Sequence, residues 1–315
     1  MASAGAFSPV AGVPLMLAPD LVLVLAPNPS PMTYLGTNSY ILGTDDVAII
    51  DPGPDDPAHM SALRAAINGR RVTHILVTHS HLDHSPLAGP LSRETGAPVH
   101  AFGDSRAGRS TIMKQLAQDG LTGGGEGIDT GFTPDITLQD GEMIDVAGKP
   151  LTALHTPGHI GNHLCFLWGD AVFSGDHVMG WATSLVSPPD GDLTDFMQSC
   201  ARLQHVAASA YYPGHGAPVA DPKARLAWLI AHRREREAQI IAALSAGPAN
   251  VADLTQKIYT DVATLLLPAA QRNVFAHLID LAGQGKVIAD PVLGVDAAFT
   301  LQGRGHTETM PRKKP

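Results

Sequence analysis

The amino-acid sequence predicts a layered α/β domain followed by a small, mainly helical domain. Three observations lead to this prediction. Segments with the composition of strands and helices alternate at short intervals between residues 38 and 102. His and Asp residues recur in Gly- or Pro-containing turns directly after four separate strand-like segments. From about residue 222 the chain changes to helical segments, which two short strand-like segments follow.

The α/β domain begins with an irregular, Pro-rich lead-in over residues 1–32, in which residues 21–25 are expected to form a strand. Residues 38–42 and 47–50 flank the turn-like residues 43–46, a pattern typical of a hairpin. The elements expected next are a helix at 57–67, a buried strand at 72–77, a helix from about 85, and a strand at 97–102.

The second half of this domain is predicted from shorter patterns. Residues 104–134 hold a helical stretch around Met113 and a Gly-rich stretch at 123–127, which we interpret as a mobile flap beside the site or as a plain surface loop. The glycine spacing matches neither phosphate-binding motif. Strands are expected at 141–146, 151–154, 165–167, 171–173 and 211–212, and a helix at 196–206.

The C-terminal region has a different pattern. Helices are predicted at 224–244, 252–259 and 269–282, and two short strands at 286–288 and 298–301. Three helices followed by a small hairpin are typical of a winged-helix domain. We therefore divide the chain into an α/β domain at 1–221, a winged-helix-like domain at 222–303 and a flexible tail at 304–315.

Composition and charge argue against several classes of protein. Two cysteines are too few for a disulfide framework, and no Lys or Arg precedes Arg64, so the positive start of a secretory signal is absent. No stretch reaches the roughly 20 apolar residues that span a bilayer. Residues 1–221 hold 9 Lys and Arg against 22 Asp and Glu, a net charge of −13, which does not suit a polyanion. We therefore expect a cytoplasmic protein without a membrane partner.

Potential metal ligands are clustered in one short stretch of the sequence. Residues 78–85 hold three His and one Asp, and they follow the apolar residues 75–77, which are expected to lie in a buried strand. His79 and His81 are two positions apart, so in extended backbone they point to the same side. Imidazole nitrogen and carboxylate oxygen suit zinc or a similar metal. Four donors so close together favour two metal ions, or a shared site completed by other segments.

Similar turns follow later strands. Together with residues 78–84, these turns resemble those of the metallo-β-lactamase fold hydrolases of the glyoxalase II type, over roughly residues 20–220: Thr156-Pro157-Gly158-His159, Ser174-Gly175-Asp176 and Pro213-Gly214-His215. The resemblance implies a four-layer αββα sandwich. It also implies two metal ions, one held by His79, His81 and His159, the other by Asp83, His84 and His215, with Asp176 bridging them.

The C-terminal region extends this resemblance. The turn at 213–216 and the arginine-rich helix after it are similar to a subgroup with a winged-helix extension. That subgroup includes a lactamase-like endoribonuclease and thioesterases that release polyketide chains. We expect such an extension to mediate homodimerisation or to cap the active site.

Four residues near these turns are candidates for other roles. Asp51 ends a predicted strand, and we interpret it as a buried carboxylate that orients a metal-ligating His, with a turn former as the alternative. His163 is expected to orient a ligand or to face the substrate. His177 and Trp181 are expected at the pocket mouth as substrate-binding residues, although a structural role suits His177 equally well.

The ligand chemistry predicts a hydrolase. Two zinc ions that share a hydroxide bring the pKa of water near neutrality and supply a nucleophile without an activated Ser or Cys. Asp83 is expected both to bind metal and to orient that hydroxide or move its proton. We therefore predict a dinuclear metal-dependent hydrolase that cleaves an ester, thioester or lactone-type small molecule. Zinc is the expected metal, and iron or manganese can occupy the same ligands.

Three other functions suit parts of the pattern. A single-strand endoribonuclease would use the extension and its arginines, but the charge of residues 1–221 opposes nucleic-acid binding. A DNA-binding sensor is less favoured, because the predicted helix at 269–282 offers only Arg272 as a basic side chain. β-Lactam hydrolysis has no support beyond the name of the fold.

Overall fold

The structure, a computed structural model, describes residues 7–122 and 127–303. The chain divides into two compact units, Met1–His232 and Arg233–Pro315. Helix α5 (Pro222–Leu244) runs through this division. The predicted domain boundary after residue 221 stays a prediction, and the tail predicted at 304–315 lies outside the described residues.

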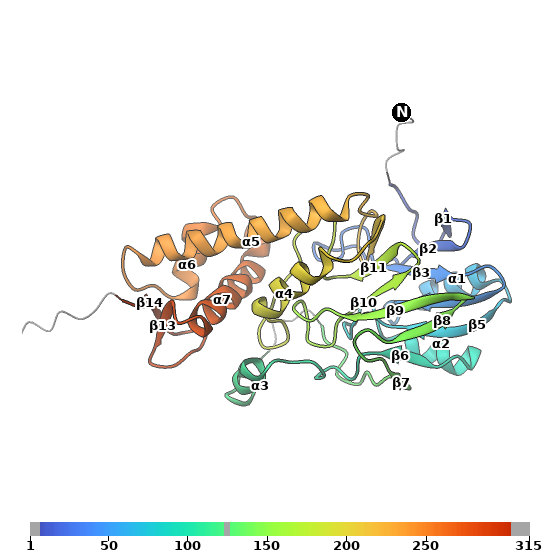
Figure 1. The fold of residues 1–315 in the computed structure, drawn as a ribbon, viewed down its shortest axis with the longest axis horizontal. Coiled ribbons are helices and arrows are strands. Elements are labelled where there is room, and N and C mark those ends of the chain that lie inside the picture. The colour runs from blue at the N-terminus through green and yellow to red at the C-terminus, as the bar shows by residue number, and fades with distance from the viewer. Residues whose placement is uncertain (1–6, 123–126, 304–315) are drawn as a thin grey trace, which may run out of the picture. The chain divides into compact units, whose positions relative to one another are not determined.

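The first unit is built on two mixed β-sheets (Figure 1). In the first sheet the strands follow chain order, with antiparallel pairs up to β4 and parallel pairs from β4 onward. Parallel neighbours end at the same edge, so the residues after β4 and β5 come together. The strands of this sheet are β1 (Leu15–Ala18), β2 (Leu21–Leu25), β3 (Asn38–Leu42), β4 (Asp46–Ile50), β5 (Arg71–Leu76), β6 (Val99–Ala101) and β7 (Ile136–Thr137).

The second sheet has the strand order β12-β11-β10-β9-β8. Its pairs are antiparallel except β11 with β12, which is parallel, so residues that follow these two strands also share an edge. The strands are β8 (Met143–Val146), β9 (Lys149–His155), β10 (Leu164–Trp168), β11 (Ala171–Gly175) and β12 (Ala210–Pro213).

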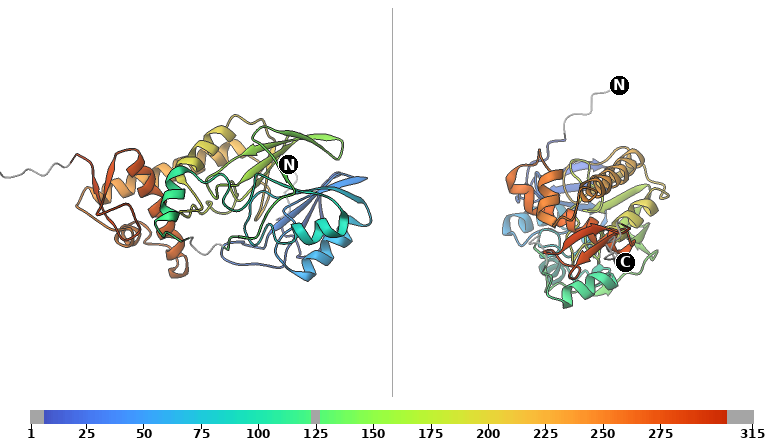
Figure 2. Two further views of the ribbon diagram at one scale, coloured as in Figure 1. Left: turned by 90° about the horizontal axis from the view of Figure 1, so that it is seen from below. Right: turned by 90° about the vertical axis from the view of Figure 1, so that its left-hand side faces the viewer.

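Helices cover the outer faces of both sheets (Figure 2). On the first sheet, Leu63 of α1 (Pro57–Ile67) and Leu91 of α2 (Ala88–Thr95) lie in one buried cluster with Ile75. On the second sheet, the Tyr211 hydroxyl donates to the Leu203 carbonyl of α4 (Leu193–Leu203).

The two sheets pack on each other through their inner faces. Tyr40 and Ile50 of the first sheet lie in one buried cluster with Leu164, Phe166 and Phe173 of the second. Burial of such side chains contributes about 1.5–3 kcal/mol each. The predicted four-layer αββα sandwich is therefore confirmed.

Local capping explains where the helices begin. Asp56 accepts the His59 amide hydrogen at the start of α1, and Pro57 is the first helical residue, as the sequence predicts. Helix α4 begins at Leu193, three residues before the predicted start, because the Asp192 carboxylate accepts the Thr194 and Asp195 amides. The predicted flap contains α3 (Thr111–Gln118), whereas residues 123–126 of its Gly-rich stretch lie outside the described residues.

The second unit holds the end of α5 and the predicted helices and hairpin: α6 (Val251–Ile258), the 3-10 turn η1 (Thr264–Leu266), α7 (Leu267–Gly283), β13 (Val287–Asp290) and β14 (Ala298–Leu301). Its core contains Leu254, Phe275 and Phe299. Within residues 7–122 and 127–303, no helix is long and apolar enough to cross a membrane. The cytoplasmic location stays a prediction.

Candidate metal centre

The predicted ligands lie in turns that follow strands of both sheets. The turn after β5 carries His79 to His84, and the turns after β9, β11 and β12 carry the others. The structure brings all seven predicted ligands together. Their donor atoms form a first group of His79, His81 and His159 and a second group of Asp83, His84 and His215, with the atoms of each group within 4.8 Å of one another. A third set that meets the same limit, His79, His84 and Asp176, overlaps both groups.

The first group consists of three imidazoles that face one another. His79 Nε2 lies 3.0 Å from His81 Nδ1, which lies 3.1 Å from His159 Nε2. Burial, together with the neighbouring imidazoles, lowers the pKa of His81 to about 3 and holds the pKa of His79 well below its ordinary value. These two rings are therefore neutral, as metal ligands must be.

A backbone contact fixes the third imidazole. His159 Nδ1 lies 2.7 Å from the Leu185 carbonyl oxygen, which can only accept a hydrogen bond. The Nδ1 atom therefore carries the proton, and Nε2 faces His81 with its lone pair free when the ring is neutral. Such a partner sets both the tautomer and the ring direction of a metal ligand.

The second group is held by carboxylate and carbonyl oxygens. His84 Nδ1 donates to Asp51 Oδ2 at 2.9 Å, and His215 Nδ1 donates to the Gly36 carbonyl at 3.1 Å. Their Nε2 atoms therefore point inward, 3.3 Å and 3.1 Å from Asp83 Oδ2.

Asp176 lies between the two groups. Its Oδ1 is 3.6 Å from His84 Nε2, and its Oδ2 is 3.2 Å from His215 Nε2 and 3.8 Å from His159 Nε2. One carboxylate thus reaches imidazoles of both groups. This position agrees with the bridging role that the resemblance implies, and the role itself stays a prediction.

The charges of the second group favour a cation. Burial would raise the pKa of Asp83 and Asp176, but the imidazoles of His84 and His215 hold both pKa values well below their usual range. Burial lowers the pKa of His215, but Asp176 and Asp83 outweigh it and raise that pKa to about 10. The two carboxylates are therefore ionised and neighbour positive charge, which a divalent metal can supply in place of the imidazolium protons.

Two buried atoms also indicate a missing partner. His84 Nε2 and Asp176 Oδ1 have no hydrogen-bond partner within the described residues. An unsatisfied buried polar group costs roughly 1–3 kcal/mol, so a metal ion that accepts both atoms as ligands would remove a destabilising feature. The donor set therefore fits a metal centre with nitrogen and oxygen ligands.

Asp51 contacts the predicted ligand His84, and its orienting role stays a prediction. It is 2 % exposed, and its backbone is left-handed with φ 50°. Besides His84, its carboxylate accepts the Thr78 amide and hydroxyl, each at 2.7 Å. Because β4 and β5 are parallel neighbours, the residue after β4 can hold the start of the ligand-bearing turn after β5.

The two remaining histidines, His163 and His177, are both fully buried. His163 lies behind a ligand: its Nδ1 is 3.0 Å from the Thr156 hydroxyl, and its ring stacks on His79 at a centroid distance of 5.2 Å. His177 is wholly buried and its ring lies 4.5 Å from that of Phe196 on α4. The prediction that His177 faces substrate is therefore corrected, because the turn after Asp176 directs this ring toward α4.

Trp181 is 36 % exposed and lies beside the ligand turn. A Cβ atom on Gly216, the neighbour of His215, would lie 2.6 Å from Trp181 Cδ1. The indole also stacks on the Tyr34 ring, with centroids 4.9 Å apart and an interplanar angle of 17°. We call these two rings the aromatic pair. Tyr34 is not predictable from the sequence as part of this site, because 147 positions separate it from Trp181 and no periodic pattern links them.

Part of the predicted flap borders the turn after β5, which carries His79 to His84. The Leu82 amide donates to the Gly127 carbonyl at 2.7 Å, and Ile128 forms a β-bridge with His81. Leu82 itself is 49 % exposed. The segment after residue 126 therefore lies beside the metal ligands, as the interpretation of a flap requires.

The comparisons with known proteins agree with this geometry. A sequence pattern described as the metallo-beta-lactamase superfamily matches residues 32–215, which is more than half of the chain. The chain belongs to this superfamily. Members of the superfamily are hydrolases, and the chain is accordingly a hydrolase. A pattern described as a beta-lactamase associated winged helix domain matches residues 251–291, which confirms the winged-helix prediction.

Individual relatives of the superfamily support the assignment. The atrochrysone carboxyl ACP thioesterase of Aspergillus fumigatus is 32% identical over 239 residues, which cover 73% of this chain and 66% of that protein. The beta-lactamase-like protein 2 homolog of Drosophila melanogaster is 28% identical over 283 residues, 86% of this chain and 90% of that protein. The crystal structure of a metallo-beta-lactamase family protein from Thermus thermophilus has a TM-score of 0.71 at 28% identity, covering 91% of this chain and all of the other.

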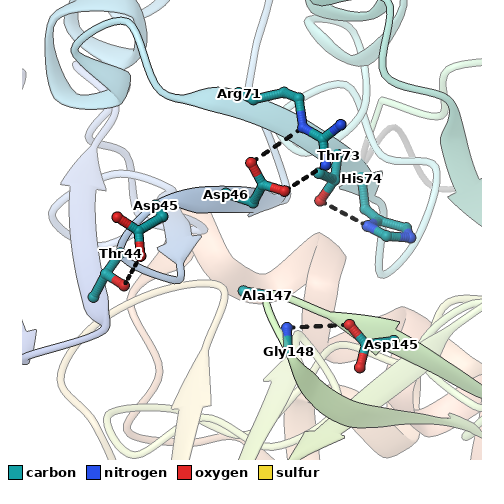
Figure 3. Close-up of a pocket in the computed structure, with 9 residues that line it drawn as sticks. All are labelled: Thr44, Asp45, Asp46, Arg71, Thr73, His74, Asp145, Ala147 and Gly148. Carbon is teal, nitrogen blue, oxygen red and sulfur yellow. Dashed lines mark hydrogen bonds and ion pairs between the residues drawn. The ribbon is translucent and has the colours of Figure 1, made fainter.

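A polar cleft lies at the opposite ends of β4 and β5 from the metal centre (Figure 3). Arg71, the first residue of β5, forms an ion pair with Asp46 there, and Asp145 accepts the Gly148 amide. These carboxylates have partners within the protein. We therefore assign this cleft no role in the reaction.

Proposed function

We propose that this superfamily member is a dinuclear zinc hydrolase that cleaves an ester, thioester or lactone. The observation that carries the proposal is the convergence of seven His and Asp donors in three overlapping sets, which are linked through His79 and His84. Three or four donors satisfy one zinc ion, so this number suits two. Imidazole and carboxylate ligands suit zinc, and iron or manganese are the alternatives.

The metal ions, Asp83 and the groups that orient the imidazoles would each have a separate role in the reaction. Bound metal ions would activate water and polarise the bond to be cleaved. Asp83 is the best placed proton acceptor, because its side chain is 23% exposed whereas that of Asp176 is 10% exposed. Its pKa is held low, so it is ionised at neutral pH and can orient water and accept a proton. Asp51, Leu185 and Gly36 hold imidazoles in one tautomer, which limits reorganisation during the reaction.

The surroundings favour an apolar, acyl-bearing substrate. The aromatic pair and Leu82 present partly exposed apolar surface next to ligand turns, and such surface binds acyl or aryl groups. The relative that is named a thioesterase supports thioesters in particular. This chain spans just under two thirds of that relative, so the substrate is our proposal for this chain.

Endoribonuclease activity is less well supported. The arginine-rich part of α5 is the feature that suggests it, but Arg233 is 2 % exposed and donates to Asn273 Oδ1 of α7 at 3.0 Å. Arg236 lies over the Tyr259 ring, 4.6 Å from its centroid. These two side chains stabilise the second unit. Homodimerisation stays a prediction.

Turnover of a substrate panel tests the proposal. Zinc-loaded protein is expected to hydrolyse acyl thioesters, lactones or aryl esters, with the highest kcat/KM for an aromatic acyl thioester. Trp181→Ala should lower that kcat/KM about tenfold, mainly through KM, because an aromatic contact contributes about 0.5–1.5 kcal/mol beyond its buried area. Trp228→Ala is the matched control, since Trp228 packs on Arg225 and His232 of α5.

The panel also contains a labelled single-stranded RNA at low salt. Cleavage of RNA without turnover of any acyl substrate would replace the proposal with a nuclease. If both tryptophan variants behave alike, the aromatic pair has no part in substrate binding.

A further inference from the structure

Asp83 has one hydrogen-bond partner from outside the ligand set among the described residues. The Thr37 hydroxyl lies 3.1 Å from Asp83 Oδ2, and the other two contacts of this carboxylate are with His84 and His215. Thr37 is fully buried, although Asp83 is only partly so. A carboxylate in a partly exposed turn thus has one fixed anchor.

Asn28 determines the direction of that hydrogen bond. Asn28 Oδ1 accepts the Thr37 amide hydrogen at 2.9 Å, and this places Asn28 Nδ2 3.0 Å from the Thr37 hydroxyl oxygen. The amide nitrogen of Asn28 can only donate, so the Thr37 hydroxyl oxygen accepts from it and its own hydrogen is directed elsewhere. The Thr37 hydroxyl hydrogen therefore points at Asp83 Oδ2.

The backbone around Thr37 is tied to the turn that carries His215. Thr37 forms a β-bridge with His215, and the Asn38 amide donates to the Gly214 carbonyl at 2.7 Å. Asn38 Nδ2 also donates to the Pro213 and Gly216 carbonyls at 3.0 Å and 2.9 Å. The Thr37 hydroxyl is therefore held at a fixed place relative to a ligand of the second group.

We propose that Thr37, oriented by Asn28, is a positioning residue that holds Asp83 between His84 and His215 so that the second group can bind its metal. This inference rests on the proposed dinuclear centre. An orienting hydrogen bond of this kind affects metal affinity by about 10- to 100-fold. The first group, His79, His81 and His159, should not depend on Thr37 in this way, because the Thr78 hydroxyl and the Leu185 carbonyl contact His79 and His159.

Zinc titration of the metal-free protein against a chromophoric chelator tests the inference without any substrate. Thr37→Val keeps the shape of the side chain but removes the hydroxyl, and Thr37→Ser keeps the hydroxyl. Thr37→Val is expected to bind the second zinc at least tenfold more weakly and the first with unchanged affinity, while Thr37→Ser stays within threefold of wild type for both. Turnover of Thr37→Val should fall in kcat, with KM within twofold.

Thr44→Val is the matched control, because the Thr44 hydroxyl also faces a carboxylate, that of Asp45, in the polar cleft away from the metal centre (Figure 3). If Thr37→Val does not fold, Asn28→Ala serves as the second variant, because it removes the hydrogen bonds that orient Thr37. It should weaken binding of the second zinc ion about three- to tenfold. The inference is overturned if Thr37→Val binds both zinc ions like wild type, if Thr37→Ser is equally impaired, or if wild type binds fewer than two. Two zinc ions without turnover of any substrate would overturn the proposed reaction and leave this inference standing.

Discussion

Asp83→Asn is expected to lower kcat about a thousandfold while the protein stays folded. The amide has the shape of the carboxylate and can still accept the Thr37 hydroxyl hydrogen, so the local geometry survives. It has no negative charge, however, and cannot accept a proton. General-base catalysis contributes about 10²- to 10⁴-fold, and weaker metal binding adds to the loss.

Three measurements on this variant separate the two contributions: kcat, zinc content and melting temperature. Asp45→Asn, in the exposed turn before β4, is the control and should stay within twofold of wild type. An Asp83→Asn enzyme that holds two zinc ions and retains more than a tenth of wild-type kcat would show that Asp83 neither accepts a proton nor orients water.

Gly214→Ala is expected to reduce kcat/KM at least a hundredfold by deforming the metal centre. A Cβ atom at Gly214 would lie 2.4 Å from Asp176 Oδ1 and 2.6 Å from His84 Cε1. The His84 ring cannot move away easily, because its Nδ1 atom is hydrogen-bonded to the Asp51 carboxylate. The methyl group therefore displaces the Asp176 carboxylate, and zinc content should fall below two per chain.

This substitution does not impose backbone strain, since Gly214 is absent from the positive-φ glycines of the described residues. The loss should therefore appear in activity and zinc content more than in the melting temperature. Gly131→Ala is the control, because its Cβ would meet nothing closer than Asp129 Oδ1 at 3.7 Å. Wild-type zinc content and kcat/KM in Gly214→Ala would contradict the geometry of the centre.

Much of the site can be predicted from the sequence, because its ligands lie in turns that directly follow strands. Each ligand turn follows an apolar run, and parallel pairing of β4 with β5 and of β11 with β12 brings the ends of those runs together. His, Asp, Gly and Pro in such turns leave few alternatives to a metal site. The structure places the seven donors together for this reason.

Other parts were not readable, for identifiable physical reasons. Leu185 and Gly36 hold ligands through backbone carbonyls, which every residue possesses, so side-chain identity gives no signal. The role of Thr37 depends on a contact across 46 positions. His177 follows Asp176 directly, yet the turn directs the two side chains to different surroundings, and only tertiary packing decides which one faces the other ligands.

Metal analysis paired with activity measurements tests the proposed dinuclear hydrolytic centre most directly. Purified protein is analysed for metal content, and thioester and lactone hydrolysis is measured before chelation, after chelation and after zinc is restored. We expect about two metal ions per chain, at least a hundredfold loss of turnover on chelation, and recovery with zinc. Absence of bound metal, or turnover that survives complete metal removal, would contradict the ligand assignment and the function inferred from it.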